Sequence, residues 1–188
     1  MITLQLMVNS NILALKTNIE HWRSAKMLFI DKVLSNHGVK QVDMLWTNCE
    51  LLKDDKNHFT WRGLKMFIKL LTQKLTLLGM KNVHVISDST LAWWNYDING
   101  NFNNAASNLF IDECKRKGIN ATIKAINGAG FKQRHDEGLD FSSLLNNSII
   151  RNDSKILIIG GWNDESFDQE TIKTSIDSFI NICKEKSH

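Results

Sequence analysis

The chain has 188 residues, a length that suits one domain with a sizeable hydrophobic core. Hydrophobic residues make up 43% and charged residues 23%, and the net charge is only +3, with the basic residues scattered along the chain. This composition is typical of a globular protein and gives no argument for a nucleic-acid partner. No apolar stretch approaches the length of a transmembrane helix, so no membrane span is expected.

The three cysteines are Cys49, Cys114 and Cys183. Their wide spacing forms no zinc or redox motif, so the cysteines predict no metal site. The odd number of cysteines favours a reduced, cytoplasmic protein, and a secreted protein with a free thiol remains the alternative. The first residues carry no secretory signal pattern.

Apolar runs alternate with stretches of helical periodicity, and no repeat or linker interrupts them. Short buried runs predict strands, and apolar residues at helical spacing predict helices that begin at capping residues and end near glycines. In chain order the prediction is strand Ile2–Val8, helix Asn18–Leu34, strand Gln41–Thr47, a helix from Thr60 to about Leu78, strand Val83–Ser87, helix Ala105–Lys117, strand Thr122–Ile126, helix Leu139–Asn147, strand Lys155–Gly160, and helix Gln169–Lys186 capped by Asp168.

This alternation predicts a single α/β domain over residues 1–188, with about five parallel strands between two layers of helices. In such sheets, active sites gather at the carboxyl ends of the strands. Polar clusters there are therefore the first candidates for chemistry.

Three strand ends carry such clusters. Ser89 follows a strand directly in VHVISDST, and its alternative role is that of a helix N-cap. Gly128 and Gly130 follow a strand in IKAINGAGF, where backbone N–H groups can approach a ligand or simply form a turn. Asn163 follows the glycines of ILIIGGWND, and its amide can donate to an oxyanion or close an Asx-turn.

A fourth cluster, KDDKNHFTWRG, contains Asp55 and His58 in a D-x-x-H spacing. A carboxylate three residues before a histidine can accept from its Nδ1, which fixes the tautomer and leaves Nε2 as a base.

Together the four clusters resemble the SGNH (GDSL) hydrolases, whose blocks are G-D-S, a glycine block, G-x-N-D and D-x-x-H. Here S-D-S, N-G-A-G-F, G-W-N-D and D-K-N-H correspond to them. The D-x-x-H block comes last in the family and precedes the serine block here, so the resemblance implies a circularly permuted, flavodoxin-like SGNH fold. A permuted order is physically reasonable because domain termini often lie close together.

The resemblance implies a serine esterase without cofactor that acts on a small-molecule or glycan acyl ester. Ser89 would be the nucleophile, His58 the general base and Asp55 its orienting carboxylate. The oxyanion hole would comprise the Ser89 N–H, the Gly128 N–H and the Asn163 amide, with Gly130 as the alternative to Gly128.

Two tryptophans near these blocks are candidates for substrate binding. Trp162 lies inside the G-W-N-D turn, and Trp93 follows the nucleophile closely. Packing of the first helix is the alternative role for Trp93.

Two further hypotheses stay open at this point. Ser87 stands where the family has glycine, which favours a catalytically inactive SGNH-like binding module. The other hypothesis is an unpermuted flavodoxin-like domain with an accidental D-x-x-H. The permuted fold predicts the strand order Thr122–Ile126, Val83–Ser87, Lys155–Gly160, Ile2–Val8, Gln41–Thr47, and its distinctive feature is the parallel pairing of Ile2–Val8 with Lys155–Gly160.

Overall fold

The computed structural model describes residues 2–6, 12–17, 25–39, 41–44, 59–92, 105–132, 140–151 and 153–186. Its elements in chain order are β1 Ile2–Leu6, β2 Ile12–Thr17, α1 Ala25–Asn36, β3 Gln41–Met44, α2 Trp61–Leu77, β4 Asn82–Ser87, α3 Ser89–Ala92, α4 Ala105–Arg116, β5 Asn120–Ala125, α5 Phe141–Asn146, β6 Lys155–Ile159, the 3-10 helix η3 Trp162–Ser166, and α6 Gln169–Lys186.

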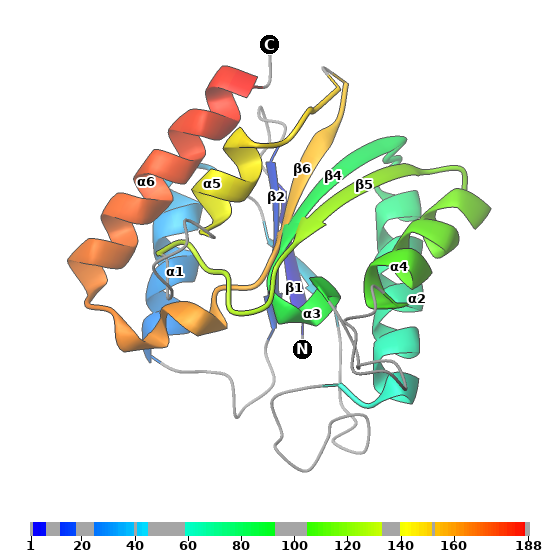
Figure 1. Cartoon of the computed structure of the whole chain (residues 1–188), viewed down its shortest axis with the longest axis horizontal. Helices are drawn as coiled ribbons and strands as arrows, with labels where there is room; N and C mark the ends of the chain where they lie inside the picture. Colours follow the sequence, from blue (N-terminus) through cyan, green and yellow to red (C-terminus); the bar gives the residue numbers. More distant parts are fainter. Residues whose placement is uncertain are drawn as a thin grey trace.

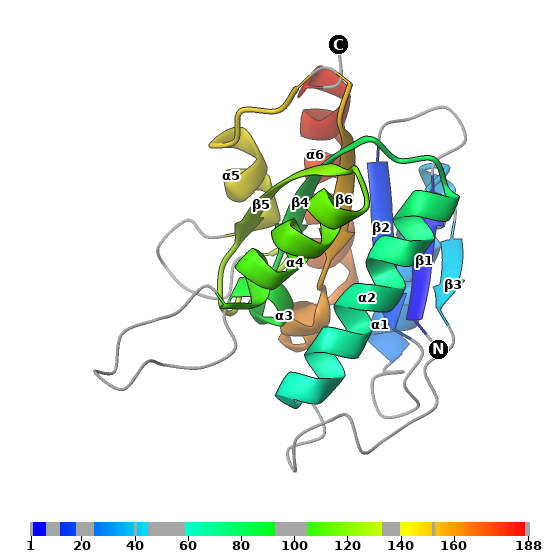
Figure 2. The ribbon, with the colours of Figure 1, turned by 90° about the vertical axis from the view of Figure 1, so that its right-hand side faces the viewer.

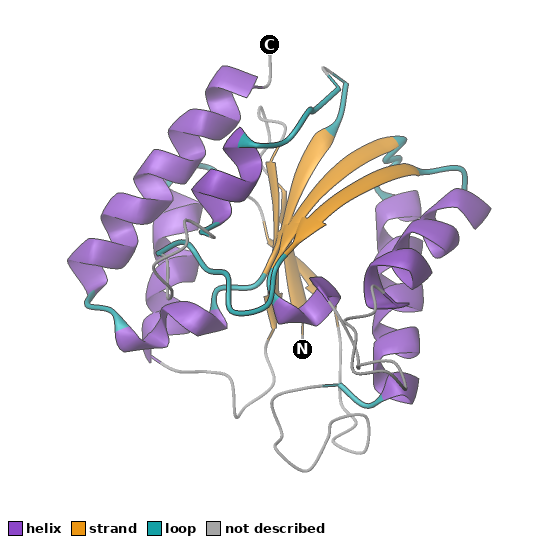
Figure 3. Ribbon diagram, in the orientation of Figure 1, coloured by secondary structure: helices purple, strands orange, loops and turns teal. Residues whose placement is uncertain are grey.

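Helices cover both faces of one sheet. Helices α1, α5 and α6 lie on one face and α2 and α4 on the other (Figure 1), and colouring by secondary structure shows the same three layers (Figure 3). The short helix α3 lies at the end of β4. The chain is therefore of the mixed α/β class, as its alternating pattern predicted.

Among the described residues, the sheet has six strands in the order β3-β1-β2-β6-β4-β5. Strands β2, β6, β4 and β5 pair in parallel, whereas β1 is antiparallel to both of its neighbours, β2 and β3. The prediction of about five strands, all parallel, is therefore wrong, because the sheet contains a sixth strand and β1 is antiparallel to its neighbours. Residues 7–11 separate β1 from β2, and a connection that short permits only antiparallel pairing.

The predicted pairing of Ile2–Val8 with Lys155–Gly160 is also wrong. The strand beside β6 is β2, in parallel register from Ile12↔Ile156 to Leu15↔Ile159. The amino-terminal region thus does neighbour the last strand of the chain, but through a strand that the apolar pattern did not reveal. Since β2 and β3 are both antiparallel to β1, they point the same way, and the carboxyl ends of β3, β2, β6, β4 and β5 share one edge.

Two predicted helix starts are confirmed by their caps. Thr60 precedes α2, and its Oγ1 accepts from Gly63 N at 3.0 Å. Asp168 precedes α6, and its Oδ1 accepts from Thr171 N at 2.9 Å. These side chains satisfy backbone N–H groups that have no partner within the first turn of the helix. The predicted helix Asn18–Leu34 corresponds to α1, with residues 18–24 outside the described part of the chain.

The core has two halves, one on each face of the sheet. Phe67, Phe110, Val85 and Leu157 belong to the half under α2 and α4, whereas Ile86, Ile158, Phe141 and Phe179 belong to the half under α1, α5 and α6. Strands β4 and β6 are buried on both faces, and apart from His84 and Ser87 their buried residues are apolar. Within the described residues, no helix has the length and hydrophobicity needed to cross a bilayer.

Candidate active site

Three neighbouring strands end at the same level of the sheet. Ile126 N donates to Ser87 O at 3.1 Å on one side of β4, and Asp88 N donates to Ile159 O at 3.2 Å on the other. These bonds extend the ladders just past the ends of β4, β5 and β6. The segments that begin with Ser89, Asn127 and Gly160 therefore leave the sheet side by side.

Ser89 is the first residue of α3, and Asp88 caps that helix. Thr90 N donates to Asp88 Oδ1 at 2.9 Å, and Ala92 N donates to Asp88 O at 3.0 Å. The alternative role of Ser89 as the N-cap is therefore wrong, because Asp88 is the N-cap residue of α3. Ser89 is half-buried, and among the described residues no hydrogen bond engages its hydroxyl.

Ser87, which stands in place of the family's glycine, faces into the sheet. Its side chain is fully buried, and its Oγ donates to Ile159 O at 2.9 Å. The hydroxyl is thus bound to the adjacent strand. It takes up none of the exposed surface beside Ser89.

The segment after β5 turns sharply at Gly128. Ala129 N donates to Ile126 O at 3.2 Å, and Gly128, the third residue of this turn, has φ +82°. A positive φ at that position favours glycine because a Cβ would clash with the backbone. Gly128 is half-buried, whereas Gly130 is buried.

The segment after β6 holds the Gly128 turn in place. Gly160 and Gly161, at φ +149° and +114°, turn the chain into η3. From η3, Asn163 Nδ2 donates to Ala129 O at 2.8 Å, which leaves the second hydrogen of the amide for another acceptor. Asp164 accepts from Phe131 N at 2.9 Å and from Lys132 N at 2.7 Å.

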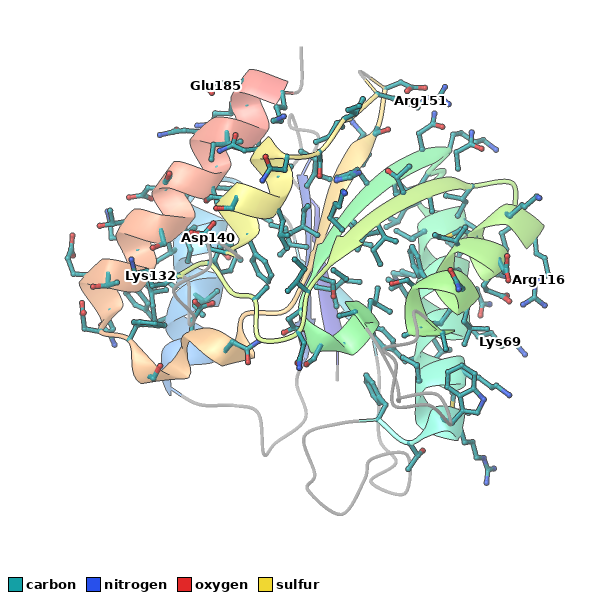
Figure 4. All side chains as sticks on the ribbon, viewed as in Figure 1. Lys69, Arg116, Lys132, Asp140, Arg151 and Glu185 are labelled. Atoms are coloured by element: carbon teal, nitrogen blue, oxygen red, sulfur yellow. The ribbon has the colours of Figure 1, made fainter. Side chains whose placement is uncertain are left out.

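Burial, helped by the negative charges of Asp88 and Asp140, raises the pKa of Asp164 to about 7. The N–H groups of Lys132 and Phe131 oppose this shift because they stabilise the charged form. Figure 4 shows Lys132 and Asp140 on the α5–α6 side of the sheet. Asp140 itself caps α5, where it accepts from Ser143 N at 2.6 Å.

The structure brings together Ser89, Gly128 and Asn163, three of the predicted site residues. Asp55, His58 and Trp93 lie outside the described residues, as does the side chain of Trp162. The contact of Gly130 with Asp164 was not predicted, because no local pattern joins the two residues.

Within the described ranges, no group of three or more His, Cys, Asp or Glu side chains that could hold a metal ion is found. Comparison of the chain with protein-family models, curated proteins and solved structures found no match.

Proposed function

We propose that the chain is a serine hydrolase of acyl esters, resembling the SGNH family in permuted order. Ser89 is the nucleophile, His58 the general base and Asp55 the carboxylate that orients it. The observation that carries the proposal is the juxtaposition of Ser89, Gly128 and Asn163 at three adjoining strand ends, with Asp88 rather than Ser89 capping α3. The Ser89 hydroxyl is then available for chemistry.

The oxyanion hole of this proposal consists of the Ser89 N–H, the Gly128 N–H and the Asn163 amide. Gly128 is preferred over Gly130 because it is the more exposed of the two and forms the apex of the turn. Gly130 instead faces the Asp164 carboxylate, which would lie 2.6 Å from an added Cβ. Donors fixed in this way stabilise a developing negative charge without reorganising.

The described residues next to His58 support its role as the base. Phe59 is buried in the core half that also contains Leu91 of α3. Its ring stacks on that of Phe67 in α2, with 5.0 Å between the ring centroids. In Figure 2 the amino-terminal end of α2 lies toward the same edge of the sheet as α3. Residues 59–60 therefore lead into α2 near the edge of the sheet at which α3 lies, and His58 immediately precedes them in the sequence.

Strand β3 lies at the edge of the sheet opposite β5, as the permuted order predicted, although β1 and β2 rather than one strand lie between β3 and β6. The segment 45–58 leaves from the carboxyl end of β3, and this end shares its edge with the carboxyl end of β4. Strand β1 separates β3 from β2 and moves this departure point one strand farther from Ser89. Residues 45–58 are long enough to span the extra distance.

In the proposed reaction, Ser89 Oγ attacks the ester carbonyl carbon while His58 Nε2 accepts its proton. The tetrahedral intermediate collapses, the alcohol leaves with the proton from His58, and an acyl-Ser89 ester remains. Water then attacks that ester, again with His58 as base, and releases the acid and the free serine. The substrate is a small-molecule or glycan acyl ester.

A fluorophosphonate probe followed by intact mass measurement tests the nucleophile. The wild type should gain one adduct and hydrolyse p-nitrophenyl acetate, and Ser89→Ala should lose both properties. His58→Ala should lose most of the activity, and the double variant should be little worse, since the triad acts as a unit.

Ser87→Ala is the matched control, because it removes a hydroxyl two positions away that is bonded to Ile159 O. It should still be labelled and active. A wild-type protein that neither labels nor hydrolyses esters would leave the inactive binding module as the better reading.

A further inference from the structure

Asp164 makes an unusual set of contacts for a residue that the proposed reaction does not use. Its side chain is fully buried, with one carboxylate oxygen on Phe131 N and the other on Lys132 N. The carboxylate therefore joins the segment after β6 to the segment after β5. Both segments carry proposed oxyanion-hole donors, Asn163 on one and Gly128 on the other.

Gly130 shows how closely the two segments fit together. A Cβ on Gly130 would lie 2.6 Å from Asp164 Oδ1 and 2.7 Å from Oδ2. The φ of Gly130 is outside the positive range, so its backbone conformation is open to any residue. Glycine is needed there for space alone, because the carboxylate occupies the position of the missing side chain.

The backbone between Gly128 and Lys132 is held at further points. Asn163 Nδ2 donates to Ala129 O at 2.8 Å, and Phe141 N donates to Gly130 O at 2.7 Å. Asp164 bonds the next two N–H groups. Every residue from 129 to 132 is thereby bonded to η3 or α5, and the turn at Gly128 is the part left facing outward.

We propose that Asp164 is a positioning residue of the oxyanion hole, which fixes the Gly128 turn against Asn163 through its bonds to the Phe131 and Lys132 N–H groups. This inference rests on the proposed esterase function. Asp164 touches neither the substrate nor the reacting atoms, and it acts through the backbone that it holds.

The charge of Asp164 gives this role a pH dependence. The described groups that act on the carboxylate are Asp88 from the β4–α3 turn, Asp140 before α5, and the backbone of Phe131 and Lys132. As a carboxylate, Asp164 accepts both N–H bonds with charged oxygens, whereas as a neutral acid it accepts them more weakly. Because the pKa of Asp164 is about 7, its hydrogen bonds to the Phe131 and Lys132 N–H groups become stronger as the pH rises through neutrality.

Asp164→Asn tests the role with almost no change in shape. The variant amide presents an NH₂ group to one of the two backbone donors and breaks that bond. We expect kcat for p-nitrophenyl acetate to fall by about tenfold to a hundredfold with KM within about twofold, since small displacements of catalytic donors cost this much. The acid limb of the kcat profile should also become shallower, because only His58 then titrates.

Gly130→Ala is the second variant, because the added methyl group would occupy the space of the Asp164 carboxylate and displace it. It should reproduce the loss of kcat. Asp168→Asn is the matched control: it removes a carboxylate that caps α6 and is exposed. It should leave kcat and its pH profile unchanged, because an asparagine side chain can still cap α6.

An NMR titration separates failure of this inference from failure of the proposed function. In the wild type, the amide protons of Phe131 and Lys132 should shift with a midpoint near pH 7, and these shifts should vanish in Asp164→Asn. An active enzyme in which folded Asp164→Asn and Gly130→Ala keep wild-type kcat would overturn the positioning role. If the Phe131 and Lys132 amide signals shift with pH but the protein has no esterase activity, the proposed esterase function is overturned. The hydrogen bonds of Asp164 would then have a structural role only.

Discussion

His84 provides a test of the fold that does not depend on enzymatic activity. It is 2% exposed in the middle of the sheet, and its Nδ1 shares a hydrogen bond of 2.7 Å with Thr122 Oγ1. Its Nε2 is buried and has no partner among the described residues. Burial, helped by the positive charges of Lys124 and Lys186, lowers the pKa of His84 to about 4.

The sign of the effect on stability follows from this shift. The unfolded chain binds a proton at His84 below its ordinary pKa of 6.5, and the folded chain binds it only near pH 4. Between these values the unfolded state holds more protons, so folding stability falls as the pH falls. From pH 7 to pH 5 the loss from His84 amounts to about 2 kcal/mol.

Asp164 changes stability in the opposite direction over the same range. Its pKa is raised from 3.8 to about 7, so the folded state holds more protons between those values and gains stability as the pH falls. That gain is also about 2 kcal/mol from pH 7 to pH 5. The two contributions nearly cancel, so the pH dependence of the wild type by itself reveals neither.

Urea unfolding of His84→Leu, followed by far-ultraviolet circular dichroism between pH 5 and pH 7.5, isolates the histidine. Leucine has a similar volume and does not titrate, so the stability of the wild type relative to the variant should fall by about 2 kcal/mol from pH 7 to pH 5. Asp164→Asn should give a difference of the opposite sign. A difference in unfolding free energy between the wild type and His84→Leu that stays constant over this range would refute the burial of His84. An NMR signal of the His84 imidazole that titrates near pH 6.5 would refute it as well.

Two further predictions concern the segments that frame the site. Gly160→Ala should destabilise the fold by about 2 kcal/mol or more, because a Cβ there would lie 2.7 Å from Asp88 Oδ2 and 2.8 Å from Phe141 Cζ at a positive φ; equal urea midpoints for variant and wild type would contradict this. Thr60→Ala should cost about 1 kcal/mol through the lost bond to Gly63 N, and Thr60→Ser should restore most of it; a Thr60→Ser variant as unstable as Thr60→Ala would show that the hydroxyl bond is not the cause.

Local patterns in the sequence determined most of the secondary structure. Helices α2 and α6 begin at the residues that the capping side chains Thr60 and Asp168 indicated. Strands β4 and β6 followed from apolar runs that are buried on both faces. Caps and apolar periodicity act between residues a few positions apart, so they can be read without knowing the rest of the fold.

The sequence also placed Ser89, Gly128 and Asn163 at strand ends, and the parallel pairing of β5, β4 and β6 puts those ends together. Which function each side chain could serve was left open by the pattern. Only the structure decided that Asp88 caps α3 and that Ser87 binds Ile159 O, because both outcomes depend on the direction of a side chain relative to a neighbouring strand.

The amino-terminal part of the sheet was decided by tertiary structure alone. The sequence analysis predicted one strand, Ile2–Val8, in a region where the structure has two strands that pair antiparallel. The choice of β2 as the neighbour of β6 depends on backbone hydrogen bonds between residues more than a hundred positions apart. The fit of Gly130 against Asp164 is of the same kind. A glycine forms no pattern that can be recognised in the sequence. The need for glycine at position 130 becomes visible only when the fold places the Asp164 carboxylate where a Cβ would lie.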